Sequence, residues 1–174
     1  MDEDARVLAE LVAKQAITEV LHRYCRALDR LDRPMADTLW HPDGTADYGP
    51  DIFQGTGQGF VDYVFATHLL MSGHSHTVSN VLIDVDVEAG AAGSETYASV
   101  WLRPLPRDGV VRDTRVRGRY LDRWSRRDGV WAIDHRTYVG DVMSVDARPE
   151  SPMTDGSAAT GRRDRTDPSY LVLP

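Results

Sequence analysis

The chain has 174 residues, of which 41% are hydrophobic and 27% charged, as expected for one globular domain with a sizeable core. Its formal net charge of -7 argues against general nucleic-acid binding, because phosphates require a basic patch. The single cysteine, Cys25, excludes an internal disulfide, so a cytoplasmic location is the default expectation. No N-terminal stretch resembles a signal peptide, and no run approaches the ~20 apolar residues that cross a membrane, so we expect no membrane partner.

The N-terminal segment is predicted to be helical. Apolar residues recur every three or four positions over residues 5–31, which predicts one amphipathic helix capped by Asp2 or Asp4. The predicted stripe comprises Val7, Leu8, Leu11, Val12, Ile17, Val20, Leu21, Tyr24, Cys25 and Leu28. A short second helix is expected over residues 34–40, because Pro34 suits a first helical turn.

Turns, a short strand and a third helix should follow. The sequence His-Pro-Asp-Gly at 41–44 is typical of a turn, and residues 45–48 predict a strand with which Ile52 and Phe53 pair back. A third helix is predicted over residues 58–71, with Phe60, Val61, Val64, Phe65, Leu69 and Leu70 on its apolar face.

After residue 71 the pattern changes from helical to strand-like. Four segments rich in β-branched and aromatic residues, separated by short charged or glycine-containing turns, predict an antiparallel meander over 75–88, 94–104, 113–126 and 130–142. The class is therefore α+β, with a cone-shaped, curved antiparallel (mixed) sheet wrapped around N-terminal helices. Such a cone suits a small-molecule pocket.

The C-terminal residues differ in composition from the rest. Residues 145–169 are dense in Pro, Gly, Ser, Arg and Asp, which predicts a tail with little structure. We therefore divide the chain into a domain over 1–144 and a tail over 145–174. The apolar residues 170–173 could dock on this subunit or a neighbour, and the tail could close either subunit's pocket. Deletion of 148–174 would then alter substrate affinity more than melting temperature.

A histidine and an aspartate are the leading candidates for chemistry. Strand alternation places His76, Val78, Asn80 and Leu82 on one face, with His74 nearer the loop. Asp29, at the end of the first helix, could fix the tautomer of His76 and make its other nitrogen a better base. Alternatively, the histidines are structural and Asp29 is one more charge at a solvated helix end.

Two tyrosines could assist this pair. Tyr24 falls on the apolar stripe and Tyr48 on the short strand, and phenols can donate hydrogen bonds to a carbonyl or a departing hydroxyl. Ordinary core packing is the alternative for both. Because Tyr24 and Asp29 point to different sides of an ideal helix, both reach one cavity only if that cavity caps the helix end.

Other polar residues are weaker candidates. These are Asp47, Asp84, Asp86 and His135. The alternating arginines Arg115, Arg117, Arg119 and Arg123 are interpreted as a solvated or subunit-facing surface, with an anion site as the alternative. His74 and His76 could chelate a metal in principle, but no further ligand stands at a familiar spacing, so we expect no metal and no cofactor.

Several ordered motifs together resemble a known family. They are residues 17–29 (Ile-Thr-Glu-Val-Leu-His-Arg-Tyr-Cys-Arg-Ala-Leu-Asp), 39–44 (Leu-Trp-His-Pro-Asp-Gly), 53–55 (Phe-Gln-Gly), 76–80 (His-Thr-Val-Ser-Asn), 119–124 (Arg-Tyr-Leu-Asp-Arg-Trp) and 129–133 (Gly-Val-Trp-Ala-Ile). Over residues 8–142 the chain resembles the SnoaL-like branch of the NTF2-like superfamily. It is most similar there to the group of scytalone dehydratase, hexachlorocyclohexane dehydrochlorinase and bile acid 7α-dehydratase.

This resemblance implies a function and a site. Lyases of the group use an Asp–His dyad, which Asp29 and His76 match, and the dehydratases add tyrosines, which Tyr24 and Tyr48 match. The resemblance therefore implies a cofactor-independent dehydratase-type lyase acting on a hydrophobic cyclic compound, steroid-like or polyketide-like. Residues expected to bind this substrate are Trp40, Phe53, Phe65, Val78, Asn80, Tyr97, Ser99 and Tyr120.

Two other functions and the assembly remain open at this point. The fold also hosts isomerases and cyclases of the ketosteroid isomerase or SnoaL type, and non-catalytic ligand-binding or dioxygenase β-subunit-like modules. The lyases resembled are trimers and many relatives are dimers. We therefore expect a homo-oligomer, with a trimer favoured over a dimer.

Overall fold

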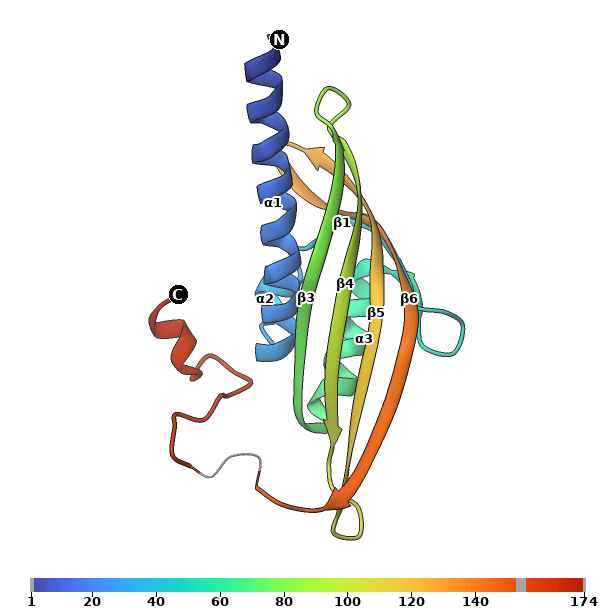
Figure 1. Ribbon diagram of the computed structural model, residues 1–174, viewed down its shortest axis with the longest axis vertical. Coiled ribbons are helices and arrows are strands. Elements are labelled where there is room, and N and C mark those ends of the chain that lie inside the picture. The colour runs from blue at the N-terminus through green and yellow to red at the C-terminus, as the bar shows by residue number, and fades with distance from the viewer. Residues whose placement is uncertain (1, 153–155, 174) are drawn as a thin grey trace.

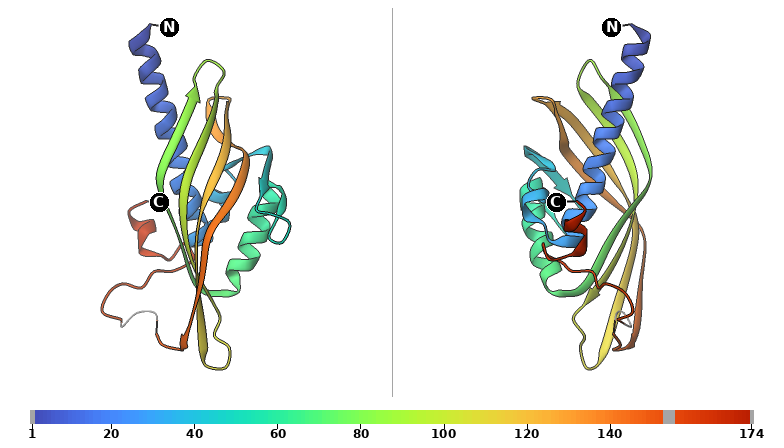
Figure 2. Two further views of the ribbon diagram at one scale, coloured as in Figure 1. Left: turned by 45° about the vertical axis from the view of Figure 1, so that its right-hand side comes forward. Right: turned by 90° about the vertical axis from the view of Figure 1, so that its left-hand side faces the viewer.

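The computed structural model describes residues 2–152 and 156–173 and contains one curved sheet with helices packed on its concave side (Figures 1 and 2). Six strands follow the order β2-β1-β6-β5-β4-β3 across the sheet. Strands β3, β4 and β5 each pair antiparallel with the strand that follows in sequence, whereas β1 pairs parallel with β6. The predicted α+β class with a curved mixed sheet is confirmed.

The elements have the following bounds in chain order. They are α1 (Glu3–Arg30), α2 (Arg33–Ala36), β1 (Trp40–Asp47), β2 (Gln54–Thr56), α3 (Gly57–Leu69), β3 (Met71–Asp86), β4 (Ala91–Pro104), β5 (Val110–Arg127), β6 (Val130–Pro149) and the 3₁₀ helix η1 (Pro168–Leu171). Among the described residues, no helix is both long enough and apolar enough to span a membrane.

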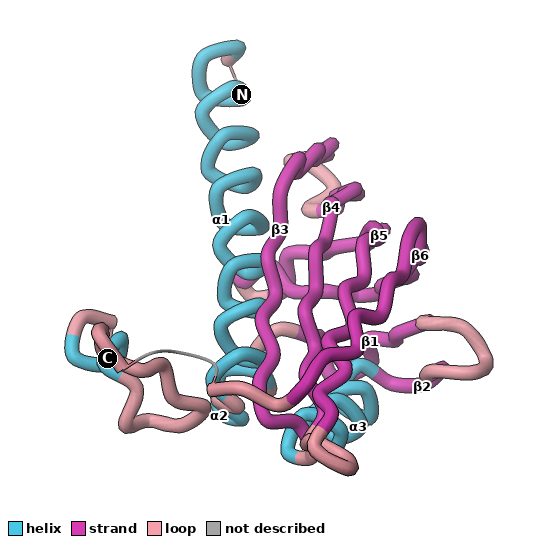
Figure 3. The backbone as a smooth tube through the Cα atoms, turned by 60° about the horizontal axis from the view of Figure 1, so that its bottom comes forward, coloured by secondary structure: helices cyan, strands magenta, loops and turns pink. Residues whose placement is uncertain are grey.

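Helix α1 runs along β3, the edge strand of the sheet (Figure 3). Asp2 caps the helix by accepting a hydrogen bond from the Ala5 backbone N–H, and Leu31 ends it in a left-handed conformation. From Ile17 onward the predicted stripe is buried, except for Val20, which is partly buried. The first turns extend past the sheet (Figure 1), so Leu8 and Leu11 are 62% and 60% exposed rather than in the core.

The region after α1 differs from the prediction. Helix α2 ends at Ala36, and β1 already begins at Trp40, so the expected turn at 41–44 lies inside a strand. The register between β1 and β6 shifts between Trp40 and Thr45, which accommodates the irregular backbone. Tyr48 follows directly after β1, and its backbone N–H donates to the Phe53 carbonyl at 2.8 Å.

The meander is longer than the sequence pattern indicates. Strand β6 continues to Pro149, so residues 145–149 pair with the beginning of β5 and are not part of an unstructured tail. Their pairing is supported by Asp113, which accepts hydrogen bonds from Arg103 and Arg148. The division of the chain at residue 144 therefore cuts through β6. Residues 153–155 and 174 of the expected tail lie outside the described residues.

A bulge in β3 changes which side chains face the core. The pairing with β4 shifts between Ser79 and Val81, and Asn80 has a φ of 48°. His76 and Val78 face inward before the bulge, but Asn80 and Leu82 are exposed after it. The predicted shared face is therefore wrong beyond Val78, because the extra residue inverts the alternation.

The described part of the tail lies against the C-terminal half of α1. Asp32 accepts hydrogen bonds from the Tyr170 hydroxyl at 2.6 Å and from Arg165 at 3.2 Å, and Arg30 forms an ion pair with Asp167. Arg26 lies over the Tyr170 ring. Docking on this subunit thus uses polar contacts and one aromatic ring, while Leu171, Val172 and Leu173 remain exposed.

Candidate active site

Asp29 and His76 form a hydrogen-bonded pair across 47 positions of sequence. Asp29 lies in the last turn of α1, and His76 lies on the neighbouring strand β3. Asp29 Oδ1 is 2.7 Å from His76 Nδ1, and Asp29 Oδ2 accepts a hydrogen bond from the His76 backbone N–H at 3.0 Å. Both carboxylate oxygens are therefore used to hold one residue.

This pairing determines which nitrogen of His76 is free. An ionised carboxylate can only accept hydrogen bonds, so Nδ1 carries the proton and Nε2 presents a lone pair. The two side chains are mostly buried, at 6% exposure for His76 and 15% for Asp29. Asp29 can therefore stabilise the imidazolium that forms when Nε2 accepts a proton.

A cavity of about 180 Å³, here called the central cavity, lies against His76. Most of its wall is apolar or aromatic. It is lined by Tyr24, Leu28, Tyr48, Ile52, Phe60, Tyr63, Val64, Thr67, His68, Met71, His76, Val100, Leu102, Val116, Tyr120 and Tyr138. The few polar atoms in such a wall are the groups able to orient a ligand.

Tyr24 and Tyr48 meet on this wall with their hydroxyl oxygens 3.1 Å apart. Burial raises the pKa of both phenols well above the ordinary value, so both remain protonated at neutral pH. One hydroxyl donates to the other, which leaves one phenolic proton for a ligand. Tyr48 is held between the rings of Phe60 and Tyr138, whose centroids lie 4.1 and 5.3 Å away.

A buried ion pair lies behind the tyrosines. Arg136 is 0% exposed, and its Nε and Nη2 donate to Asp122 at 2.7 and 2.8 Å. Its guanidinium carbon lies 4.3 Å from the centroid of the Tyr24 ring and 4.0 Å from that of Tyr120. Its Nη1 has no hydrogen-bond partner among the described residues. A fixed positive charge therefore stands beside the phenols.

The chain matches a family model over residues 9–137, described as a SnoaL-like domain. The chain belongs to this family. The match confirms the resemblance that the sequence motifs indicated.

Solved structures show the same fold. A scytalone dehydratase-like protein from Novosphingobium aromaticivorans is 23% identical, with a TM-score of 0.69, 88% of this chain and 99% of that chain covered. A type 2 hexachlorocyclohexane dehydrochlorinase (LinA) is 14% identical, with a TM-score of 0.72 and coverages of 84% and 97%. An NTF2-like superfamily protein from Salmonella enterica is 18% identical, with a TM-score of 0.64 and coverages of 86% and 99%. No curated protein matched.

Only some of the expected substrate-binding residues of this SnoaL-like protein reach the central cavity. Tyr120 lines it. Other expected lining residues pack into or against the hydrophobic core without lining the cavity; these are Trp40, Phe53, Phe65 and Val78. The Trp40 ring, for example, packs closely against Gly57 and not against the cavity.

Three expected residues lie on the wrong face of the sheet. Asn80 is exposed because of the β3 bulge. Tyr97 and Ser99 are also exposed, since they alternate on β4 with the inward-facing Ala98 and Val100. Strand β4 instead contributes Val100 and Leu102 to the cavity.

Sequence reasoning missed two features of the site. The first is the pair Asp122 and Arg136, which are direct register partners on β5 and β6. The sequence feature that could have revealed this pair is a charged residue on an otherwise apolar strand face. Asp122 shares its face of β5 with Tyr120 and Trp124. The second is His68, four residues after Val64 on the buried face of α3, while the expected Leu69 and Leu70 are 65% and 70% exposed.

Two of the weaker candidates, Asp47 and His135, have other partners. The Asp47 carboxylate accepts hydrogen bonds from Gly49 and Gln54, and His135 Nδ1 lies 2.7 Å from the Thr45 hydroxyl. Within residues 2–152 and 156–173, no three His, Cys, Asp or Glu side chains are grouped so that they could hold a metal ion.

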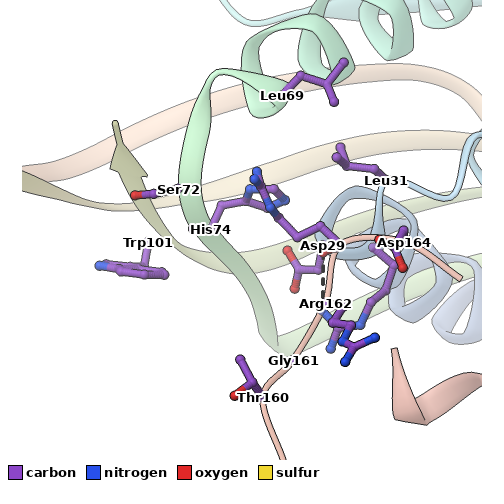
Figure 4. A pocket seen from close by; sticks show the side chains of 13 residues that line it. Asp29, Leu31, Leu69, Ser72, His74, Trp101, Thr160, Gly161, Arg162 and Asp164 are labelled. Carbon is purple, nitrogen blue, oxygen red and sulfur yellow. Dashed lines mark hydrogen bonds between the residues drawn. The ribbon is translucent and has the colours of Figure 1, made fainter. Parts of the chain in front are cut away.

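Asp29 also lines a second and more polar space, here called the tail hollow (Figure 4). It has a volume of about 690 Å³ and is lined by Asp29, Arg30, Leu31, Leu69, Ser72, Gly73, His74, Trp101 and residues 160–164 of the tail. Asp29 lines this hollow whereas His76 lines the central cavity, so the pair stands between the two spaces. The free nitrogen of His76 makes the central cavity the candidate active site.

Proposed function

We propose that this protein is a cofactor-independent lyase that eliminates water, or another small leaving group, from a hydrophobic cyclic compound, steroid-like or polyketide-like. The observation that carries the proposal is the 2.7 Å contact between His76 Nδ1 and Asp29, with the ring facing an apolar cavity. A base held by a carboxylate and shielded from water is suited to removing a proton from carbon.

The reaction begins at His76 Nε2. This nitrogen takes a proton from a carbon acidified by a neighbouring carbonyl, and the electrons of the C–H bond form the new carbon–carbon double bond. The departing oxygen leaves with the electrons of the C–O bond. General base catalysis of this kind by His76 is worth ~10²–10⁴-fold in rate, and Asp29 supports it by stabilising the imidazolium.

The proton that completes the water molecule comes from the imidazolium of His76. Burial raises the pKa of Tyr24 and Tyr48 well above the ordinary value, so the phenols are hydrogen-bond donors rather than proton donors. Their free hydroxyl stabilises negative charge on the carbonyl or the departing oxygen. The positive charge of Arg136 behind the rings favours the same charge distribution.

The cavity size bears on how a substrate fits. At about 180 Å³ the central cavity is smaller than the ~300–1,000 Å³ typical of sites for drug-sized ligands. It would enclose the reacting ring, and the remainder of a larger steroid-like or polyketide-like molecule would lie outside.

An isomerase or cyclase is the second candidate, because the same dyad could return the proton to another carbon. The product mass separates the two, since dehydration loses one water and isomerisation loses nothing. A non-catalytic module is the third candidate, in which the contacts of Asp29 with His76 would only tie the end of α1 to β3. It has less support because the His76 ring also lines a cavity.

The test is turnover of a panel of steroid-like and polyketide-like hydroxyketones, followed by mass spectrometry. We expect a product lighter by one water from the wild type, and a fall in turnover of at least ~100-fold in His76→Ala. The control is His22→Ala, which removes an exposed histidine from α1 and should leave turnover unchanged. Near-normal turnover in His76→Ala would refute the assignment.

A further inference from the structure

His68 is a buried histidine of the central cavity that the proposed mechanism does not use. It lies on α3 and is only 3% exposed, yet its side chain lines the same cavity as His76. The centroids of the two imidazole rings are 5.3 Å apart. A group bound near the base at His76 would therefore come within reach of His68.

His68 differs from its two neighbouring histidines in having no side-chain hydrogen bond to any described residue. His76 is bonded to Asp29, and His74 Nε2 donates to the Leu28 carbonyl at 3.0 Å. The Nδ1 atoms of His68 and His74 are both buried without a partner in the described chain, but of the three histidines His68 alone has neither ring nitrogen bonded to a described residue. Buried polar side chains are normally hydrogen-bonded. Nε2 of His68 is also without a bond to any described residue but is not fully buried, so it is the ring nitrogen open to a ligand in the central cavity.

Packing alone does not account for a histidine at this position. The His68 ring stacks on His74 at a centroid distance of 4.2 Å, a contact that a phenylalanine could also make. An apolar ring would avoid leaving a buried nitrogen unsatisfied, which costs ~1–3 kcal/mol. The polar ring therefore has a use beyond filling the space.

The protonation state of His68 is defined by its surroundings. Burial lowers its pKa to about 2, and the neighbouring His74, His76 and Arg163 act in the same direction. The ring is therefore neutral at physiological pH and offers one N–H donor and one acceptor nitrogen. Such a ring can bond a hydroxyl or a carbonyl oxygen, whereas it gains little from a carbon-bound halogen.

We propose that His68 binds the substrate directly, by a hydrogen bond to a hydroxyl or carbonyl oxygen on the ring that lies against His76. The inference rests on the proposed use of the central cavity and narrows its substrate class to oxygenated cyclic compounds rather than halogenated ones. His68 is then a specificity-determining residue, because its nitrogens distinguish oxygen from chlorine at the same position of a ring.

Binding of a matched pair of probes tests this inference. 2-Naphthol and 2-chloronaphthalene have the same ring system and differ in one substituent, and their dissociation constants can be measured by calorimetry or fluorescence. The wild type should bind 2-naphthol more tightly. His68→Phe keeps the ring stack and should reduce this preference by ~5–10-fold, the worth of one hydrogen bond. His22→Phe is the control and should preserve the preference.

A reduction of less than ~3-fold in His68→Phe, or the absence of any preference in the wild type, would overturn the inference. A second readout follows the His68 ring directly in the wild type, and either of two variants can assign its resonance. In wild-type protein labelled with ¹⁵N in histidine, 2-naphthol should shift the ring-nitrogen resonance of His68, identified by its loss in His68→Phe or His68→Gln. Binding of 2-naphthol without that shift would also contradict the proposal.

These outcomes are separable from those of the lyase proposal. The probes report binding without turnover. If the wild type is inactive but shows a naphthol preference that His68→Phe reduces, the role of His68 in ligand binding stands and only the proposed reaction is refuted. Conversely, if His76→Ala loses turnover and His68→Phe keeps the naphthol preference, the lyase proposal stands and the proposed role of His68 is refuted.

Discussion

At the scale of single residues, a few buried polar side chains supply the chemical groups of the central cavity. Asp29, His76, Tyr24 and Tyr48 could be selected from the sequence because motifs of a known family surround them. Arg136 could not be selected from the sequence, because it follows Asp134 and His135 in a segment whose polar composition is typical of an exposed surface. Only the β5–β6 register, which pairs it with Asp122, shows that both charges face the core.

The buried histidine on α3 should make the stability of the protein sensitive to acid. His68 has a pKa of about 2 in the folded protein against ~6.5 when unfolded, so the unfolded state binds the extra proton between these pH values. Stability is complete above pH ~6.5 and falls as the pH is lowered through this window, by up to ~1.4 kcal/mol per pH unit from this residue.

Urea unfolding between pH 7 and pH 4 measures this effect. The free energy of unfolding of His68→Phe should fall less steeply than that of the wild type, whereas His22→Phe should follow the wild type. His74, whose pKa burial also lowers, remains in both proteins and sets part of the common slope. Equal slopes for wild type and His68→Phe would show that this imidazole is not held neutral in the folded state.

At the scale of elements, the order of helices and strands could be predicted, whereas irregularities within strands could not. Alternation in β3 gives the correct face for His76 and Val78, but the positive φ of Asn80 inverts it. Nothing in the pattern around Asn80 signals that extra residue, since asparagine also occurs on exposed strand faces. The expectation for Tyr97 and Ser99 is wrong because a strand predicted by composition alone does not reveal which of its faces is buried.

The tail gives a prediction at the same scale. None of its described residues lines the central cavity, while Arg165 and Tyr170 bond Asp32, which caps α2. Truncation after Glu150, beyond the end of β6, should therefore lower the melting temperature and leave the KM within ~2-fold of the wild type. The hydrogen bonds that it removes tie the tail to α1, to Asp32 and to the His68 backbone carbonyl, and none of them involves a side chain of the central cavity. This reverses the expectation that the tail of the same subunit closes the pocket.

Thermal denaturation and steady-state kinetics of the truncated protein provide the check. Tyr170→Phe, which removes only the 2.6 Å hydrogen bond to Asp32, is a milder variant and should produce a smaller shift in melting temperature. A large rise in KM on truncation would instead indicate that the tail of a neighbouring subunit covers the cavity.

At the scale of the whole molecule, one chain leaves many apolar side chains in contact with water. On β6 these are Val142, Met143 and Val145, and on the tail they are Leu171, Val172 and Leu173. Burial between copies of the chain would remove this exposure, which supports the proposed homo-oligomer. The family resemblance favours a trimer, with a dimer as the alternative.

The mass of the protein in solution tests the assembly. Light scattering after gel filtration should give three times 19.4 kDa for the expected trimer. Twice that value would show a dimer in place of the trimer, and the prediction of a homo-oligomer would still hold. A mass of 19.4 kDa at micromolar concentration would contradict that prediction.

The most direct test of the account is the turnover of Asp29→Asn on a substrate that the wild type is shown to convert. An amide has the shape of the carboxylate but cannot neutralise the imidazolium of His76, so kcat should fall by at least ~100-fold with little change in melting temperature. Asp51→Asn, at an exposed aspartate, should keep wild-type turnover. A kcat for Asp29→Asn within ~3-fold of the wild type would show that the carboxylate does not support His76 as a base.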